Sequence, residues 1–571
     1  MRSHICYTTG MMYLEELIVT ACNGLFGITV KPQLTRPEEQ FGDFATNVAL
    51  QLAKQLQQPP KKVAEQIQAH LIKNNDGSIA KIEIAGPGFL NFIMADSTLL
   101  KTLEQVARPN VFGSNNLLKG QTIVVEYSDP NPFKELHAGH LYTSVVGDAI
   151  ATLAEAAGAT IHRVNFGGDV GRHVAMTMWG IIKELGGENL AGLDAVDADS
   201  RANWLAKAYV AGNEAFESDP AAKQQIMAYN KQVYAVHSND DHSSPFASIY
   251  WACRTWSYDY FNDFYARIGT KFEKYYPESQ TTPLGLQIVK EQQQKGVFVE
   301  SQGAVIFNGE DYGLHTRVFI TSEGLPTYET KDVGLIFTKW ADYEFDRSII
   351  ITGNDITEYM KVVLAAISQF EPELPKRTTH LTHGMVKLKG QGKMSSRSGK
   401  ILRAVDVLDA VSEAVQKISG KPNDDTMLGA VKYAFVKPRM GGDVIFDIEE
   451  SVSLEGNSGP YLQYAHARAR SILRKSDITA KPADNLQKDE RSLLLKISQF
   501  PEVVALATNE LAPHHIATYL YELAQVFNRF YEHNRVIGDP RQAGRLSLVD
   551  AYATTLQNGL GLLNIPAPQQ M

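Results

Sequence analysis

A strand–helix–strand pattern over residues 122–165 constrains the fold of this chain more than any other feature. Thr122–Tyr127 is a short β-branched run, which is typical of a buried strand. Leu141–Ala157 is rich in alanine and valine and is followed by Gly158, so it predicts a helix that ends there. Ile161–Asn165 is a second short strand. A strand, a helix and a strand at this spacing form a βαβ unit, so we expect a multidomain α/β protein with a Rossmann-like parallel sheet.

The chain has 571 residues, which suggests about three or four domains. Before the βαβ unit, helical spacing in Phe41–Ala53 and Lys61–Ile72 and strand alternation in Ile82–Phe92 predict a small α+β domain. The expected parts are an N-terminal α+β domain at 1–118, a Rossmann-like sheet domain at 119–400 with a helical insertion at about 175–300, a connecting helical region at 401–450 and an all-α domain at 451–571. We expect Met1–Gly10 to be a loose leader.

Charge and cysteine usage exclude several classes of protein. The net charge is −9, so a nucleic-acid partner has to be held by local basic patches. The cysteines Cys6, Cys22 and Cys253 form no CxxC pair, which argues against a disulfide framework and against structural zinc. No apolar run is long enough for a membrane span, and the start of the chain is unlike a secretory signal. We therefore expect a cytoplasmic protein with no metal site of its own.

The segment His137-Ala138-Gly139-His140 lies between the first strand and the helix. A helix N-terminus after a parallel strand favours phosphate, because its free N–H groups and the helix dipole both attract an anion. Two imidazoles three residues apart share one face of the first turn, where they can donate hydrogen bonds to phosphate oxygens. Gly139 leaves room for a nucleotide to approach the backbone. A metal-binding pair and a polar helix cap are the alternatives.

Residues 387–403 form a basic stretch around Lys393-Met394-Ser395-Ser396. The stretch has no acidic residue, and its glycines at 390, 392 and 399 predict a mobile loop. Such a loop suits transient binding of a triphosphate, because it can close for chemistry and open for release. A solvated run of charge is the alternative. The basic residues are Lys387, Lys389, Lys393, Arg397, Lys400 and Arg403.

In this order and at this separation, the two segments resemble the two ATP-binding motifs of class I aminoacyl-tRNA synthetases. Val125–Pro132 and Tyr328–Asp332 resemble the arginine-binding segments of the arginyl-tRNA synthetase family. The resemblance implies that ATP with Mg²⁺ activates L-arginine to arginyl-adenylate with release of pyrophosphate. Arginine is then transferred to the 3′ end of tRNA(Arg) with release of AMP. It also implies that tRNA is bound before activation.

The chemistry of arginine agrees with the residues in these segments. A guanidinium is planar and is best held by carboxylates in bidentate geometry. Glu126 stands at a strand end, and Asp332 follows Tyr328 by about one helical turn on the same face. Asn131 suits the α-amino or carboxylate end of arginine. The alternative is that Glu126 and Asp332 are surface carboxylates.

The resemblance assigns a role to each residue of the two motifs and the two arginine-binding segments. Catalysis falls to Lys134, His137, His140 and Lys393; ATP binding to His137, Gly139, His140, Met385, Val386, Lys393, Met394, Ser395 and Ser396; arginine binding to Glu126, Asn131, Tyr328 and Asp332.

Segments near both ends of the chain also resemble this family. Phe41–Asn47 and Gly86–Asn91 resemble its N-terminal domain, which touches the tRNA elbow, and Gly459–Arg468 and Tyr519–Val536 resemble its helical anticodon-binding domain. RNA bases are bound by aromatic and basic side chains, although such residues also pack ordinary helices. The tRNA-binding candidates are Phe41, Asn47, Tyr464, Arg468 and Tyr531. We expect a monomer.

The loop departs from the family pattern at one position. Many class I enzymes have a second lysine where this chain has Ser396. Lys134, three residues before His137, is close enough along the chain to reach the phosphates in its place. A lysine at this position resembles a known arrangement in arginyl enzymes.

Two further positions also depart from the pattern. Ile356 stands where many relatives have a glutamine that is used near the substrate amino group, so Asn354 or Asp355 is expected to take over that role. Tyr142 stands where an arginine is common after the histidine motif.

Two other functions fit parts of this pattern. One is a nucleotidyltransferase or amide ligase that acts on a small molecule without RNA, and the long helical C-terminal region argues against it. The other is a non-catalytic paralogue that binds tRNA or arginine, and the intact histidine motif with both carboxylates argues against it.

Overall fold

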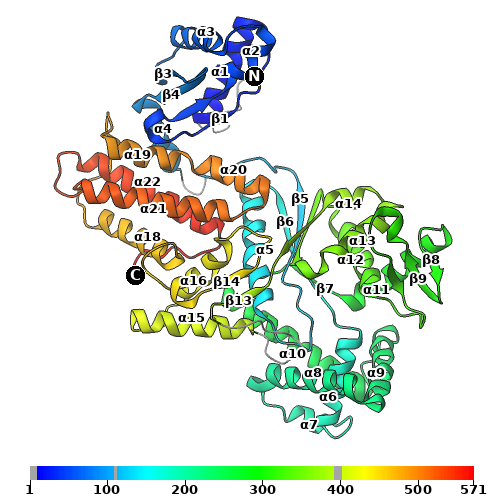
Figure 1. The fold of residues 1–571 in the computed structure, drawn as a ribbon. Helices are drawn as coiled ribbons and strands as arrows, with labels where there is room; N and C mark the ends of the chain where they lie inside the picture. Colours follow the sequence, from blue (N-terminus) through cyan, green and yellow to red (C-terminus); the bar gives the residue numbers. More distant parts are fainter. Residues whose placement is uncertain (1–9, 109–111, 391–401) are drawn as a thin grey trace.

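The computed structural model describes residues 10–108, 112–390 and 402–571 (Figure 1). The N-terminal domain has one antiparallel sheet in the order β1-β2-β4-β3, with helices packed against it. In Figure 1 this domain, in blue, lies at one end of the molecule and meets the orange helices of the C-terminal part. Its elements are α1 (Gly10–Phe26), β1 (Leu34–Thr35), β2 (Phe44–Thr46), α2 (Val48–Leu56), α3 (Pro60–Lys73), β3 (Ile79–Ala85), β4 (Phe89–Met94) and α4 (Asp96–Val106).

The helix expected over residues 41–53 is wrong in its first part. Phe44–Thr46 is instead the strand β2, which pairs with β4 and is buried throughout. Helix α2 begins only at Val48, after Asn47 as its N-terminal cap. Apolar residues follow a helical spacing over 44–46 as well as in α2. Over 44–46, however, burial of Phe44 between the strands and the helices outweighs that spacing.

A five-stranded parallel sheet forms the centre of the molecule, in the order β12-β11-β5-β6-β7. The βαβ unit expected from the sequence is confirmed, since β5 and β6 are adjacent and parallel and α5 connects them. All the strands end at the same edge, and this is where open α/β sheets bind ligands. The elements are β5 (Thr122–Glu126), α5 (Ala138–Ala156), β6 (Thr160–Gly167), β7 (Lys274–Pro277), β11 (Arg347–Gly353) and β12 (Thr378–His383).

A helical insertion separates β6 from β7. It comprises α6 (Arg172–Glu184), α7 (Leu190–Asp194), α8 (Arg201–Ser218), α9 (Pro220–Ser238) and α10 (Pro245–Ile268). The parallel sheet resumes at Lys274, so the insertion ends earlier than residue 300, where the sequence pattern places its end. The strand Lys274–Pro277 is only four residues long and half aromatic, which is too short for an alternation signal.

A second lobe follows β7 and packs on the face of the sheet opposite to α5. Helices α11 and α12 pack closely against each other, because Gly285 and Gly334 leave no room for a side chain between their backbones. The small antiparallel sheet β10-β9-β8 lies beyond them. The elements are α11 (Glu278–Gln294), β8 (Val299–Ser301), β9 (Ala304–Phe307), β10 (Arg317–Ile320), α12 (Tyr328–Tyr343), α13 (Thr357–Ser368) and α14 (Glu373–Arg377).

The remainder of the chain is almost entirely helical, as expected. It stacks between the N-terminal domain and the central sheet (Figure 1). Its elements are β13 (Val386–Leu388), α15 (Ala404–Ser419), α16 (Asp424–Val436), β14 (Val444–Phe446), α17 (Ile448–Ser451), α18 (Gly459–Arg474), α19 (Lys488–Ser498), α20 (Phe500–Glu510), α21 (His514–His533) and α22 (Gln542–Leu562). Among the described helices, none combines the length and the apolar character needed to cross a membrane.

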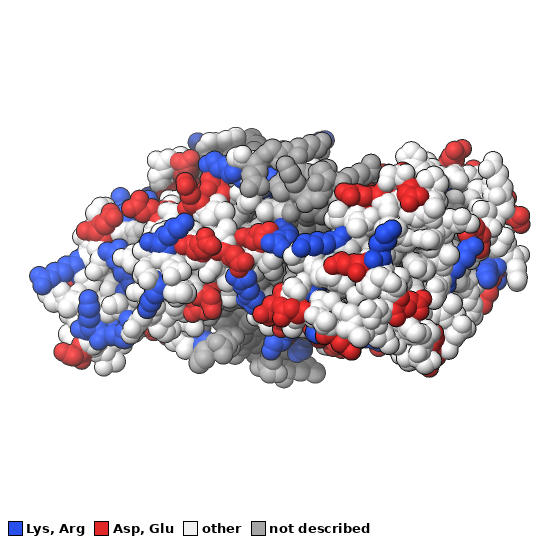
Figure 2. All heavy atoms as spheres, turned by 90° about the horizontal axis from the view of Figure 1, so that it is seen from below, with Lys and Arg blue, Asp and Glu red and all other residues white. Residues whose placement is uncertain are grey.

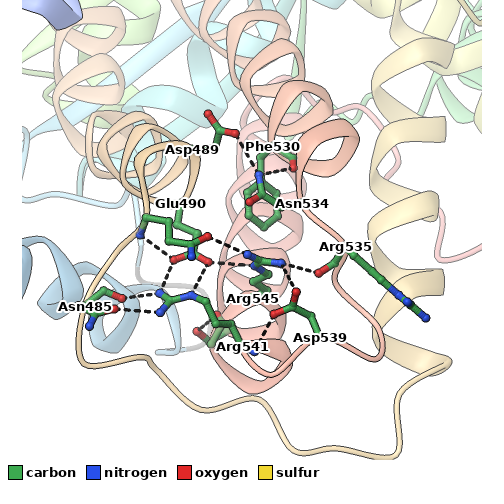
Figure 3. A network of polar contacts seen from close by, with 12 residues as sticks. Asn485, Asp489, Glu490, Phe530, Asn534, Arg535, Asp539, Arg541 and Arg545 are labelled. Atoms are coloured by element: carbon green, nitrogen blue, oxygen red, sulfur yellow. Dashed lines mark hydrogen bonds and ion pairs between the residues drawn. The ribbon is translucent and has the colours of Figure 1, made fainter.

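A buried carboxylate ties together the start of α19 and the connection between α21 and α22 (Figure 3). Glu490 accepts hydrogen bonds from Arg541, from Arg545 and from the backbone N–H of Gln487. Burial alone would raise the pKa of Glu490, but its arginine partners lower it. Arg545 also donates to the carbonyl of Arg535, whose own side chain points away from this network in Figure 3.

Arg491 links the N-terminal domain to the helical part. Its guanidinium contacts the carboxylates of Asp43 and Asp96, at 2.5 and 2.8 Å. A second ion pair, Arg36–Glu502 at 2.8 Å, crosses the same junction. Because these ion pairs are partly shielded from solvent, they hold the two domains in one orientation more firmly than fully exposed pairs would.

Acidic and basic side chains intermingle on the face of the molecule seen in Figure 2. This mixture agrees with the modest net charge of −9. Phosphate contacts on this face therefore have to come from local groups of basic residues.

Candidate active site

His137 and His140 form a reciprocal cap at the N-terminus of α5. The Nδ1 atom of His137 accepts the backbone N–H of His140 at 3.3 Å, and the Nδ1 atom of His140 accepts that of His137 at 3.1 Å. The rings stack with centroids 3.7 Å apart. A Cβ at Gly139 would lie 2.8 Å from the His137 ring, so this glycine makes room for that ring. The helix cap, which the sequence left as an alternative, is thus present in the same residues.

The cap determines which nitrogen of each ring has the proton. Burial, followed by the charge of Lys134, lowers the pKa of His137 to about 4, and burial also lowers that of His140. Both rings are therefore neutral near pH 7. Since each Nδ1 accepts a backbone N–H, the single ring proton of each imidazole lies on Nε2. Two N–H donors thus point away from the cap and are available to an anion.

Carboxylates gather at the carboxyl edge of the sheet. Glu126 ends β5 and forms a buried ion pair with Lys339 of α12. Glu278 follows β7 directly and forms another with Lys331, at 2.5 Å. Only 3% of Glu126 and 8% of Asp332 are exposed, so the alternative of surface carboxylates does not hold for this pair.

Asp332 belongs to this group but, unlike Glu126 and Glu278, forms no ion pair among the described residues. Within the described ranges, its side chain has neither a hydrogen bond nor an ion pair. Burial, and next the negative charge of Glu126, raise the pKa of Asp332 well above its ordinary value. The pKa of Asp129 is raised for the same two reasons. A cation with several N–H donors that bound here would lower the pKa of both carboxyl groups, because it would stabilise their charged forms.

Asn131 and Glu278 both lie against Gly168, in the loop that follows β6. The Asn131 side-chain oxygen accepts the backbone N–H of Gly168 at 2.8 Å. A Cβ at Gly168 would lie 2.6 Å from that oxygen and 3.1 Å from a Glu278 oxygen, so both side chains line the same small space. Tyr328, at the first turn of α12, is 54% exposed, and its ring centroid lies 5.0 Å from the ammonium of Lys331, the partner of Glu278.

Glu278, Asp129 and Lys339 belong to this group and were absent from the residues expected from the sequence. Glu278 follows the strand Lys274–Pro277, as Glu126 ends β5. A carboxylate after a strand was therefore the signal that would have found it, had that short strand been recognised. Asp129 lies within the segment 125–132 that resembles the family, and its side chain accepts the backbone N–H of Phe166.

The basic residues at both ends of the 387–403 stretch are already paired. Lys387 contacts Asp443 at 2.5 Å and Lys389 contacts Asp447 at 2.6 Å. Arg403 bonds to Glu135 and Asp406, at 3.1 and 2.5 Å. These three residues therefore anchor the ends of the stretch through ion pairs. Lys393, Met394, Ser395 and Ser396 lie outside the described residues, as do Arg397 and Lys400.

Met385 and Val386 lie where β12 passes to β13. The backbone N–H of Met385 donates to Asp443, and its carbonyl accepts from Val444. These polar groups are thus occupied, while the Met385 side chain is exposed. The part of Met385 that is available to a ligand is its thioether side chain.

The two departures from the family pattern have different surroundings. Ile356 packs against the hydrophobic core of the second lobe. Beside it, Asp355 lies close enough for its charge to raise the pKa of His137. This charge opposes the larger effect of burial, which keeps the pKa of His137 low. Tyr142 is buried and packs against His383, with ring centroids 4.6 Å apart, so its side chain does not replace an exposed arginine.

The RNA-binding candidates fall into two separate surface groups. Phe41 is 49% exposed on the N-terminal domain, and Asn47 beside α2 bonds to Gln33 and Gln51. On the helical domain, the Arg468 guanidinium lies 4.6 Å from the centroid of the Tyr531 ring. Tyr464 lies one turn before Arg468 on α18 and is exposed.

Family models match nearly the whole chain in three consecutive pieces. The Arginyl tRNA synthetase N terminal domain matches residues 12–94, the catalytic domain of tRNA synthetases class I (R) matches 103–440, and the DALR anticodon binding domain matches 462–571. The chain belongs to the arginyl-tRNA synthetase family.

Curated relatives and solved structures agree with this assignment. The arginine–tRNA ligase of Streptococcus agalactiae is 31% identical, with 94% of this chain and 95% of the relative covered. That of Porphyromonas gingivalis is 28% identical, with 98% and 99% covered. The Thermus thermophilus arginyl-tRNA synthetase structure has a TM-score of 0.79 at 25% identity, with 98% and 99% covered. The methionyl-tRNA synthetase structure from Mycobacterium tuberculosis, at 12% identity and a TM-score of 0.52, shares the fold alone, over 79% and 92% of the two chains.

The enzyme is thus a class I aminoacyl-tRNA synthetase, a ligase that activates arginine with ATP and transfers it to tRNA. Its substrates follow from the family as arginine, ATP and tRNA. This assignment sets aside both alternatives left by the sequence, the small-molecule ligase and the non-catalytic binding protein.

Proposed function

We propose that the two ends of the candidate site divide the arginine–tRNA ligase reaction between them. The histidine pair binds the phosphates of ATP, and the carboxylates at the ends of β5 and β7 and on α12 bind arginine. The observation that supports this division best is Asp332, a buried carboxylate without an ion-pair partner among the described residues, in a chain whose histidine pair is neutral near pH 7.

At the phosphate end, the Nε2–H groups of His137 and His140 donate to phosphate oxygens as the arginine carboxylate attacks the α-phosphate. A neutral donor suits this task, because it strengthens as charge develops and costs little desolvation in a buried site. Lys134 supplies the positive charge that a second loop lysine supplies in many relatives. Its charge already influences both histidines, so it lies within reach of the same phosphates. Lys393 contributes from the loop.

At the arginine end, Asp332 is the principal partner of the guanidinium. Glu126 was expected to share this role equally, but Lys339 already neutralises it. We therefore assign Glu126 mainly to placing negative potential beside Asp332. Asn131 with Glu278 binds the α-ammonium group, and Tyr328 borders the opening. Lysine lacks the planar fork of arginine and would leave these acceptors unpaired, which favours rejection of lysine without an editing domain.

Magnesium would be held chiefly by ATP itself. The described residues offer no group of three or more His, Cys, Asp or Glu side chains that could hold a metal ion. Mg²⁺ commonly binds substrate phosphates with one or two carboxylates and several waters, which fits a site of this kind. When bound, it neutralises charge on the triphosphate. The Nε2–H donors and Lys134 act on the same phosphates.

We further propose that tRNA(Arg) contacts both surface groups of aromatic and polar residues. Phe41 and Asn47 lie on the N-terminal domain, whereas Tyr464, Arg468 and Tyr531 lie on the anticodon-binding domain. The ion pairs of Arg491 support a fixed spacing between these groups. The enzyme is proposed to act as a cytoplasmic monomer.

Charging of total tRNA with each radiolabelled amino acid tests this proposal, with wild type and Asp332→Asn compared. We expect charging with arginine only, and a loss of at least about 100-fold in kcat/KM for arginine in the variant, because a buried charge-assisted partner is removed. Glu310→Gln, on an exposed turn remote from the sheet edge, is the matched control. Unchanged kcat/KM in Asp332→Asn would contradict the assignment of the guanidinium site.

A further inference from the structure

The ammonium group of Lys134 lies over an aromatic ring. Its ammonium nitrogen lies 4.3 Å from the centroid of the Tyr209 ring. Tyr209 belongs to α8, in the helical insertion between β6 and β7, so this ring is supplied by a part of the chain outside the parallel sheet. An ammonium over the face of an aromatic ring is attracted by the ring's negative face, and more so where water is excluded.

The position of Tyr209 is fixed by unusually close helix packing. A Cβ on Gly180 of α6 would collide with the carbonyl oxygen of Ala208, and a Cβ on Gly212 would collide with that of Met176. These two backbone contacts lie on either side of Tyr209, at the residue before it and three residues after it. Helix α6 in turn begins at Arg172, directly after the loop that follows β6. The close contact between α6 and α8 therefore fixes the backbone that carries this ring, and Figure 1 shows the two helices together in the insertion.

We propose that Tyr209 is a positioning residue, through which the insertion holds the ammonium group of Lys134 at the phosphate end of the active site. This inference rests on the proposed role of Lys134. Lysine is flexible and loses considerable side-chain entropy when it is ordered. A rigid ring that orders the ammonium before ATP binds reduces that loss during the reaction.

The other groups that face Lys134 come from three helices. They are His137 and His140 of α5, His173 of α6 and Glu278 of α11, of which Glu278 is the one that favours the charged ammonium. Burial lowers the pKa of Lys134 to about 8, and burial also lowers the pKa of all three histidines. The histidines are therefore neutral over the range in which Lys134 titrates.

A double-mutant cycle on arginyl-adenylate formation, measured with the full-length enzyme and tRNA present, tests the inference. Tyr209→Leu is expected to lower kcat about 3- to 30-fold, with little change in KM for arginine. Tyr209→Phe keeps the ring and is expected to behave like wild type. In a Lys134→Ala background, Tyr209→Leu is expected to have no further effect. Phe216→Leu, in the same helix and packing cluster, is the matched control and should leave kcat unchanged.

The dependence on pH separates positioning from a general structural role. Activity that needs the protonated ammonium falls as pH rises through the Lys134 pKa of about 8. Loss of the ring disfavours the charged form, so Tyr209→Leu is expected to shift this alkaline limb to lower pH, whereas Tyr209→Phe and Phe216→Leu leave it in place.

The possible failures can be told apart. If Lys134→Ala forms adenylate at a normal rate, the proposed role of Lys134 is wrong, and the inference is wrong with it. If Lys134→Ala is slow but Tyr209→Leu is as active as wild type, or is equally slowed in both backgrounds, the role of Lys134 stands and the inference about Tyr209 is overturned. If Tyr209→Leu does not fold, a Tyr209→Phe variant with a displaced alkaline limb overturns it, and one with an unchanged limb and kcat supports it.

Discussion

The imidazole rings of His137 and His140 stack with centroids 3.7 Å apart, and each Nδ1 atom accepts the backbone N–H of the other residue. One pair of side chains thus caps a helix and presents two Nε2–H donors at the place where a helix N-terminus attracts phosphate. The structural and the chemical roles are therefore coupled. Substitutions should distinguish the two roles, because loss of a helix cap lowers the folding stability modestly, whereas loss of a transition-state donor lowers the reaction rate strongly.

Replacing His140 with alanine should slow arginyl-adenylate formation about 100- to 1,000-fold, as loss of a single transition-state donor does elsewhere. Loss of the cap should cost only about 1 kcal/mol of folding free energy. Pre-steady-state adenylate formation gives the first quantity and thermal denaturation the second. A variant with a large fall in Tm and an unchanged rate would show that the ring serves the helix alone.

The rate of adenylate formation at saturating arginine should stay nearly constant from pH 7.5 down to about pH 5.5. The pKa of His137 is lowered to about 4, so its neutral form persists as the pH falls past 6.5, the ordinary value for histidine. The neutral ring then keeps both its Nε2–H donor and the Nδ1 lone pair that accepts the backbone N–H of the cap. Quenched-flow measurements across this range provide the check. A fall centred near pH 6.5 would show that the rings become protonated at their ordinary value.

Arginine binding should release protons at pH 6. The pKa of Asp332 is raised well above its ordinary 3.8 in the free enzyme, and a guanidinium partner would lower it. Binding therefore favours the ionised form, and arginine affinity should strengthen as pH rises through the raised value. Isothermal titration calorimetry in buffers of different ionisation enthalpy counts the protons. Asp332→Asn is expected to release fewer. Equal release from both proteins would place the protonated group elsewhere.

Replacing Glu490 with glutamine should destabilise the helical domain by about 3–5 kcal/mol, because it removes the buried carboxylate that Arg541 and Arg545 share and leaves Asp539 as the one carboxylate paired with Arg545 among the described residues. The pKa of Glu490 is lowered in the folded protein, so its contribution is present above the ordinary value of 4.5 and is lost as pH falls through the lowered one. Urea denaturation followed by circular dichroism measures the change. Glu510→Gln, at an exposed ion pair, is the control and should change stability by less than about 1 kcal/mol.

Local patterns in the sequence were enough for the parts of this protein that depend on neighbours along the chain. The β-branched run at 122–127, the alanine-rich helix after it and the strand at 161–165 identify the βαβ unit, because strand and helix periodicities are set by each residue's own backbone. The spacing of His137 and His140 likewise predicts a shared face, since residues three apart in a helix are neighbours.

Contacts between distant segments were decided only by the tertiary structure. The segment 44–46 became a strand through pairing with β4, against its own helical spacing. Glu126 has a cation partner because the fold brings Lys339, which is far along the chain, against the end of β5. Asp332 has no such partner among the described residues.

The same holds for the group around Lys134. No periodicity links residue 134 to Tyr209, yet two glycine contacts between α6 and α8 place the ring against its ammonium. The sequence by itself therefore determined which elements form and which residue types can do the chemistry. The fold alone decided which charges are neutralised and which remain free for a ligand, because burial and charge pairing depend on segments that meet only after the chain has folded.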